Sequence, residues 1–185
     1  MDAERYITEH WIPRRIWTHL SWPRHQDRLR RCAEALPERG SLLDVGCACG
    51  HSTEIMRGFR PEASWFGADF SRTAIAHARN NFPAMTFYRL ASPADLATLA
   101  PFDGVVCSEV LEHTPDDSVL AESLLRVTAG TLVVTTPWTR VSDPGHLRVY
   151  TEKTLRVLFE GAWAPGKIKI EMADKFLYLT YARGK

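Results

Sequence analysis

Two groups of residues in this chain could carry chemistry, and each follows a short apolar run. The first group is the turn Asp44-Val45-Gly46-Cys47-Ala48-Cys49-Gly50, and a second acid, Asp69, ends the next apolar run. Gly46 and Gly50 would let the backbone bend sharply and approach a ligand closely. An acid that follows such a turn by about 20 residues commonly binds the hydroxyls of a ribose. The pattern therefore predicts a site for a cofactor that contains a nucleoside.

The same turn argues against a dinucleotide. The pattern G-x-G-x-x-G is not met, because Ala48 and Cys49 stand where it would need glycines. Asp44 also brings a negative charge into the turn, where it would repel a pyrophosphate. A cofactor with an amino group and no phosphate fits this turn better, which favours S-adenosylmethionine over NAD. Cys47 and Cys49 lack a second cysteine pair, so a Cys₄ zinc site is excluded.

The second group is the stretch Cys107-Ser108-Glu109-Val110-Leu111-Glu112-His113-Thr114-Pro115-Asp116. A second histidine, His146, opens the segment His146-Leu147-Arg148-Val149-Tyr150-Thr151. Transfer of a methyl group to a hydroxyl requires that the acceptor be positioned and its proton removed. A histidine near its ordinary pKa can accept that proton. We expect His113 or His146 to be the general base and the other to position the acceptor.

The elements that must position these groups alternate along the chain. Apolar runs predict strands at 42–45, 64–69, 85–89, 102–107, 131–136, 167–173 and 176–182, and helical spacing predicts helices at 25–36, 52–57, 73–81, 117–127 and 151–159. Strands that alternate with helices imply right-handed crossovers and a parallel sheet, whereas the short last turn requires an antiparallel hairpin. The fold class is therefore α/β, with a doubly wound, mostly parallel seven-stranded sheet and a C-terminal antiparallel hairpin.

The composition excludes several other classes of protein. The 185 residues include 23 basic and 22 acidic side chains, which gives no support for bulk binding to nucleic acid or to an anionic membrane. No stretch resembles a signal peptide or a membrane span, and four cysteines are too few for a secreted disulfide framework. We expect a cytoplasmic protein that acts on a small molecule, with neither membrane nor nucleic acid as a partner. The oligomeric state is not predicted.

We expect a single domain, in which residues 1–40 form an N-terminal helical cap segment and residues 41–185 carry both chemical groups. Because no long insertion separates the strands, the cap segment and the loop Pro137–Tyr150 must enclose the substrate. Aromatic and arginine side chains in that loop favour a planar or anionic small substrate; they are Trp138, Arg140, Arg148 and Tyr150.

Over residues 40–185 the chain resembles the class I S-adenosylmethionine-dependent methyltransferases, because Leu42-Leu43-Asp44-Val45-Gly46-Cys47-Ala48-Cys49-Gly50 matches their first motif with Ala48 in place of the middle glycine. The resemblance implies a Rossmann-like methyltransferase domain at 41–185. It also implies a cofactor site: Asp44 for the amine, Gly46, Cys47 and Gly50 in the turn, Asp69 for the ribose, Phe70 on the adenine, Ser92 at the adenine amino group and Ser108 beside the methionyl group.

The glutamate-histidine stretch is similar to that of methyltransferases that O-methylate polyphenols in ubiquinone biosynthesis, which implies that His113 and His146 lie close together. A second resemblance is to small-RNA 2′-O-methyltransferases, which hold a divalent metal with a Glu-x-x-Glu-His…His set, here Glu109, Glu112, His113 and His146. Spacings of three and four residues would place the first three on one helix face. A metal-assisted RNA 2′-O-methyltransferase is the less favoured alternative, and a third is a non-catalytic domain that only binds S-adenosylmethionine.

Overall fold

The structure is a computed structural model that describes residues 2–162 and 166–184, and within these ranges seven strands form one sheet in the order β3-β2-β1-β4-β5-β7-β6. The strands are β1 Gly40–Val45, β2 Ala63–Asp69, β3 Thr86–Arg89, β4 Phe102–Ser108, β5 Thr128–Pro137, β6 Gly166–Ala173 and β7 Phe176–Arg183. Strands β1 to β5 are parallel, and β7 pairs antiparallel with both β5 and β6. The expected mostly parallel α/β sheet with a C-terminal antiparallel hairpin is confirmed.

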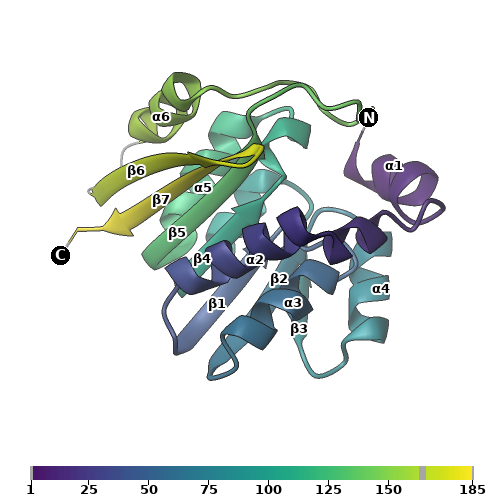
Figure 1. The fold of residues 1–185 in the computed structure, drawn as a ribbon. Coiled ribbons are helices and arrows are strands. Elements are labelled where there is room, and N and C mark those ends of the chain that lie inside the picture. Colours follow the sequence, from purple (N-terminus) through teal and green to yellow (C-terminus); the bar gives the residue numbers. More distant parts are fainter. Residues whose placement is uncertain (1, 163–165, 185) are drawn as a thin grey trace.

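The described residues form six α-helices: α1 Ala3–Tyr6, α2 Pro23–Ala35, α3 His51–Phe59, α4 Arg72–Asn81, α5 Asp117–Val127 and α6 Glu152–Gly161. Shorter helical turns span Ile7–Trp11, Ile16–Ser21, Pro93–Thr98 and Leu111–His113. Figure 1 shows α2 and α3 on the near face of the sheet and α5 on the far face. None of the helices in the described ranges is long and apolar enough to cross a lipid bilayer.

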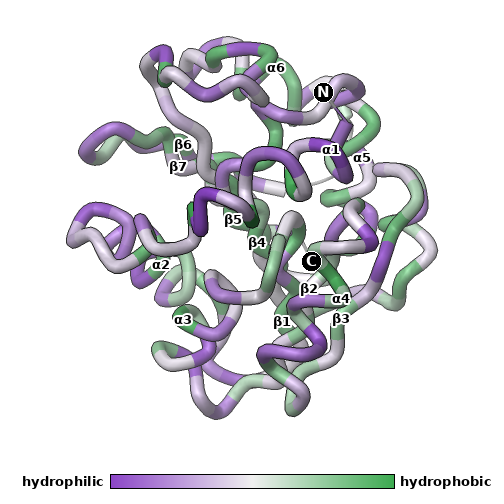
Figure 2. The backbone as a smooth tube through the Cα atoms, turned by 90° about the vertical axis from the view of Figure 1, so that its right-hand side faces the viewer, coloured by the Kyte–Doolittle hydropathy of each residue, from purple (hydrophilic) through white to green (hydrophobic). Residues whose placement is uncertain are grey.

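Both faces of the sheet are covered, which explains the continuous apolar runs of its central strands. In β1, Leu42 packs in one cluster with residues of α2 and α3, while Leu43 and Val45 pack in another with residues of α5 and α6. Parallel strands that are buried on both faces are apolar along their whole length. In Figure 2 the central strands are largely green, and the surrounding helices and loops carry the purple stretches.

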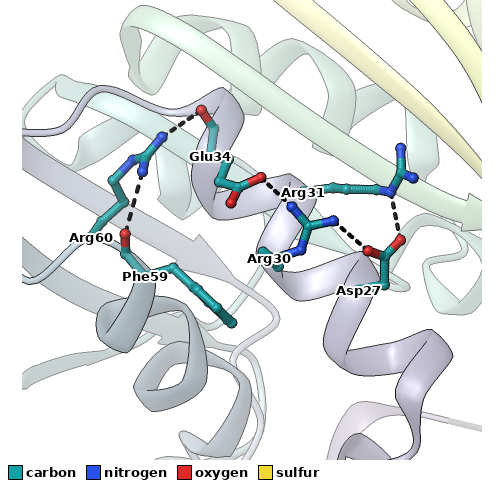
Figure 3. Close-up of polar contacts among 6 residues, drawn as sticks. All are labelled: Asp27, Arg30, Arg31, Glu34, Phe59 and Arg60. Carbon is teal, nitrogen blue, oxygen red and sulfur yellow. Dashed lines mark hydrogen bonds and ion pairs between the residues drawn. The ribbon is translucent and has the colours of Figure 1, made fainter.

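Charged residues on the outer side of α2 pair with one another, and Arg60 connects this helix to α3 (Figure 3). Asp27 accepts hydrogen bonds from Arg30 at 2.5 Å and from Arg31 at 2.6 Å, and Glu34 accepts one from Arg30 at 2.6 Å. Arg60, which follows α3, donates to the backbone carbonyl of Glu34 at 2.6 Å. Exposed ion pairs of this kind contribute at most about 1 kcal/mol each, so they add a little to the stability of α2, and the Arg60 hydrogen bond connects α2 to α3.

Candidate active site

A cavity of about 850 Å³ lies at the carboxyl ends of the parallel strands. The turns after β1, β2 and β4 line one side of it, and residues of the first 29 positions and of the loop after β5 line the other. Ligands of open α/β sheets bind at this edge, and cavities of this volume hold small organic molecules. Both chemical groups of the sequence therefore meet in one place.

The turn after β1 depends on glycine at position 46. Gly46 has a left-handed φ of +82°, and a Cβ there would lie 2.2 Å from Cγ2 of Val110. The amides of Gly46 and Cys47 both donate to the carbonyl of Ala68 in β2, at 2.8 and 3.1 Å. The turn is thereby held between the neighbouring strand and the segment after β4. Gly46 and Cys47 line the cavity, whereas Gly50 precedes α3 and is not among the lining residues.

Asp44 lies beneath the turn rather than on the cavity surface. Its carboxylate is buried and accepts hydrogen bonds from Ser52 Oγ at 3.0 Å and Thr53 Oγ1 at 2.7 Å, both in the first turn of α3. Burial raises the pKa of Asp44 to about 6, although these hydrogen bonds lower it in part. Asp44 therefore acts on the cavity through its charge and through the position of α3.

Asp69 lies on the cavity surface at the end of β2. Its side chain is 7% exposed and accepts hydrogen bonds from the amides of Ala48 at 3.0 Å and Ser71 at 2.8 Å. Burial raises the pKa of this carboxyl above its ordinary value. The carboxylate is thus fixed between the glycine turn and the start of α4, and Phe70 lines the cavity beside it.

The two serines expected at the cofactor site differ in position. Ser108 ends β4 and lines the cavity. Ser92 forms a capping box with Asp95, and its two neighbours in the chain line the cavity while Ser92 itself does not. A hydrogen bond to an adenine would therefore come from the backbone of this segment more readily than from the Ser92 hydroxyl.

The residues at this end of the cavity fit S-adenosylmethionine. At Gly46 there is no room for a side chain, so the backbone itself forms the wall. Burial raises the pKa of both Asp44 and Asp69, and a positively charged ligand nearby would stabilise their ionised forms. S-adenosylmethionine carries an ammonium and a sulfonium group and no phosphate, whereas a pyrophosphate would meet two buried carboxyls.

Glu109 departs from the helix face expected for it. Its φ is +61°, and the short helical turn Leu111–His113 begins after it, so helical spacing does not align Glu109 with Glu112 and His113. Its carboxylate instead lies 3.3 Å from Nη1 of Arg28 and accepts a hydrogen bond from Thr135 at 3.1 Å. The predicted set of four metal ligands is therefore reduced to three.

The remaining three, Glu112, His113 and His146, converge on one point. The ring centroids of His113 and His146 are 4.5 Å apart, and one potential ligand atom from each of the three residues lies within 4.8 Å of the others. The amide of Leu147 donates to the carbonyl of Glu112 at 2.8 Å, which draws the loop after β5 onto the segment after β4. Burial lowers the pKa of both histidines and raises that of Glu112.

Three residues that the sequence did not single out surround His113 and His146, namely Tyr6, His10 and Asp143. The hydroxyl of Tyr6 donates to Asp143 at 2.9 Å, and its ring centroid lies 5.0 Å from that of His113. Nε2 of His10 is 3.8 Å from the same carboxylate of Asp143. These contacts join residues more than a hundred positions apart, so local sequence spacing cannot predict them.

A second set of hydrogen bonds holds the N-terminal segment on the opposite side of the cavity from Asp143. The carboxylate of Glu4 accepts a hydrogen bond from Ser71 Oγ at 2.7 Å and another from the hydroxyl of Thr73. Both partners lie at the start of α4, next to Asp69. Residues 4–10 are therefore fixed at both sides of the cavity and cross over it.

The loop after β5 contributes less to the cavity than its composition predicts. Arg148 and Tyr150 both bind Asp117 in α5, and the indole of Trp138 donates to a backbone carbonyl at 3.0 Å. Of the four side chains expected to contact substrate, Arg140 is the one that lines the cavity. Much of the aromatic lining comes from the first 29 residues: Tyr6, Trp11, His19, Trp22 and His25.

Comparison with known proteins identifies the family. Residues 16–162 match the family described as methyltransferase domain. Trans-aconitate 2-methyltransferase of Variovorax paradoxus is 30% identical over 142 residues, which are 70% of this chain and 53% of that protein. Ubiquinone biosynthesis O-methyltransferase of Thiobacillus denitrificans is 36% identical over 106 residues, 54% of this chain and 45% of that protein. The chain thus spans about half the length of these relatives.

Solved structures show the same fold at low sequence identity. A TehB-like SAM-dependent methyltransferase from Corynebacterium glutamicum superposes with a TM-score of 0.70 at 14% identity, over 97% of this chain and 98% of that one. A SAM-dependent methyltransferase from Archaeoglobus fulgidus gives 0.67 at 16% identity, over 85% and 92%. From the family match, the relatives and the shared fold, the chain belongs to the class I S-adenosylmethionine-dependent methyltransferases.

Proposed function

We propose that this chain is an enzyme that transfers the methyl group of S-adenosylmethionine to an oxygen atom of a small organic molecule. The observation that carries the proposal is the pair His113 and His146, which lines the same cavity as the glycine turn and Asp69. Two relatives named for trans-aconitate and for ubiquinone biosynthesis support a small-molecule acceptor. A cytoplasmic location stays a prediction from composition.

The cofactor end of the cavity would bind S-adenosylmethionine, which supplies an electrophilic methyl group when bound. Asp69 would accept hydrogen bonds from the ribose hydroxyls, and Phe70 would pack on the adenine. The backbone at Gly46 and Ser108 would flank the methionyl group. Asp44, buried beneath the turn, would favour the ammonium through its charge.

The histidine pair would remove the proton of the acceptor hydroxyl. Burial lowers the pKa of both His113 and His146, so both imidazoles are neutral near pH 7 and able to accept a proton. The nearby carboxylate of Asp143 raises the pKa of both in part, which favours the imidazolium that forms during transfer. Whichever imidazole takes the proton, the other would hold the acceptor oxygen in line with the methyl group.

A second candidate mechanism uses a divalent cation held by Glu112, His113 and His146. Glu112 is fully buried, and neither of its carboxylate oxygens has a hydrogen-bond partner among residues 2–162 and 166–184. Mixed oxygen and nitrogen ligands suit manganese, zinc or magnesium, and a cation lowers the pKa of an oxygen bound to it. In this mechanism both histidines would be ligands, and neither would be the base.

A radiometric assay tests the proposal. Protein would be incubated with S-adenosyl-[methyl-³H]methionine and a panel of hydroxylated and carboxylated small molecules, with Asp69→Asn as the control that lacks the carboxylate expected to bind the ribose. Methyl transfer to one acceptor by the wild type is the expected result. Cofactor binding without transfer to any acceptor would favour the non-catalytic domain. Loss of transfer on chelation, with metal found by mass spectrometry, would favour the cation mechanism over the histidine base.

A further inference from the structure

We propose that the part of the cavity beneath α2 is a binding site for the carboxylate of a planar organic acid. This inference rests on the proposed function, since it names the class of the methyl acceptor. The site lies against Arg28 and His25, and neither residue belongs to the cofactor site described above.

The charges that line the cavity are separated along it. Four cationic side chains gather near α2 and the β6–β7 turn: Arg24, Arg28, Arg140 and Lys175. Among the acids that line the cavity, Glu109 is the one within ion-pair distance of any of these cations in the part of the chain described here. Of the other acids that line the cavity, Asp2, Glu4 and Asp69 lie toward α4 and the cofactor turn, and Asp143 lies beside His10 and Tyr6. The end of the cavity near α2 is therefore positive, and it favours an anion.

Arg28 is the buried centre of this positive end. It is 4% exposed, its guanidinium lies 4.8 Å above the ring of Phe176, and its ion pair with Glu109 is long, at 3.3 Å. Its Nε has no hydrogen-bond partner among the described residues. A buried guanidinium needs acceptors for all its donors, and a ligand carboxylate is an acceptor-only group that matches it. Arg60, which follows α3, donates to the backbone carbonyl of Glu34 and so connects α3 to the helix that carries Arg28 (Figure 3).

Two further buried nitrogens in side chains that line the cavity lack partners within the described ranges: Nδ1 of His25, whose ring lies near Arg28, and Nε1 of Trp11, farther along the row of rings. Burial and the positive charge of Arg28 lower the pKa of His25 to about 3, so this imidazole is neutral and can donate one hydrogen bond. An indole N–H can only donate. Arg28 and His25 thus each bring a nitrogen without an acceptor to the same end of the cavity, and a carboxylate supplies the acceptors that they lack.

The ligand should be flat, because rings form a continuous wall along this part of the cavity. Ring centroids are 6.3 Å apart for Tyr6 and Trp11, 5.9 Å for Trp11 and His19, 4.5 Å for His19 and His25, and 5.7 Å for His25 and Phe176. The wall begins at His113, which touches Tyr6. A planar acid could therefore lie along the rings, with its carboxylate at Arg28 and its acceptor oxygen at the histidine pair.

Calorimetric titration with benzoate and with its neutral counterpart benzamide tests this inference, in protein saturated with S-adenosylhomocysteine. We expect benzoate to bind at least about tenfold more tightly than benzamide. The double variant Arg28→Gln/Glu109→Gln removes the ion pair without leaving either charge unpaired, and it should abolish this preference. His25→Phe keeps the ring wall and should weaken benzoate alone. Arg126→Gln, on the exposed side of α5, is the matched control and should change neither affinity.

The outcomes separate the inference from the function on which it rests. Equal binding of benzoate and benzamide, or binding of neither while S-adenosylhomocysteine binds normally, overturns the carboxylate site and leaves the methyltransferase proposal intact. A preference for benzoate that survives in Arg28→Gln/Glu109→Gln also overturns it. Failure of the wild type to bind S-adenosylhomocysteine counts against the proposed function itself.

Discussion

Replacing Gly46 by alanine tests how strictly the two chemical segments depend on each other. The new Cβ would lie 2.2 Å from Cγ2 of Val110, in the segment after β4, and would sit on a backbone with φ +82°. A left-handed conformation costs an alanine about 1–2 kcal/mol, and overpacking of this kind costs about 1–3 kcal/mol. We therefore expect a loss of about 2–5 kcal/mol in the free energy of unfolding, with a shifted turn.

Gly58→Ala is the matched control. A Cβ at Gly58 meets no described atom within 4 Å, and the residue lies in α3, where alanine is favoured by up to about 1 kcal/mol over glycine. Urea denaturation and titration with S-adenosylhomocysteine would be measured for both variants. Gly46→Ala should be less stable and bind at least about tenfold more weakly, and Gly58→Ala should match or exceed the wild type. Unchanged stability and affinity in Gly46→Ala would refute the steric argument.

Three further predictions concern the histidine pair and the N-terminal segment that crosses the cavity. His113→Gln should lower kcat by about 10²- to 10⁴-fold with little change in affinity for S-adenosylhomocysteine, and a large loss of that affinity would contradict its role as a base. A histidine base must be unprotonated to accept a proton, and burial lowers the pKa of His113. We therefore expect kcat/KM to stay constant down to pH 6.5 and to fall only at lower pH. A fall in kcat/KM that begins above pH 7 would contradict this prediction. Glu4→Gln should weaken the tie to Ser71 and Thr73 and speed dissociation of S-adenosylhomocysteine in stopped-flow experiments, whereas an unchanged rate would show that the segment does not cover the cofactor.

The parts of the fold that depend on local pattern could be predicted from the sequence. Apolar runs and turn residues predict the strands and the C-terminal hairpin. The turn after β1 needs glycine at position 46 because the backbone there is left-handed. Asp69 ends β2, as the spacing predicts. A parallel sheet then brings the ends of its strands to one edge, which explains why two segments far apart in sequence share a cavity.

Contacts that join distant segments could not be predicted in the same way. Glu109 was expected on a helix face, but Arg28 of α2 binds it, and its left-handed backbone ends the alignment with His113. Arg148 and Tyr150 of the loop after β5 were expected to contact substrate, yet both bind Asp117. The N-terminal segment, including Tyr6, supplies many of the residues that line the cavity. No motif in this segment predicts that it lies there.

The most direct test of the account is calorimetric titration of metal-stripped protein with S-adenosylhomocysteine, for the wild type, Asp69→Asn and the control Glu122→Gln. Glu122 lies on the exposed side of α5 and pairs with Arg126. We predict micromolar binding by the wild type and the control, and binding about 10- to 100-fold weaker in Asp69→Asn, because a charged acceptor of two hydroxyls is lost. No binding by folded wild-type protein, or equal binding by all three, would contradict a cofactor site built on the glycine turn and Asp69.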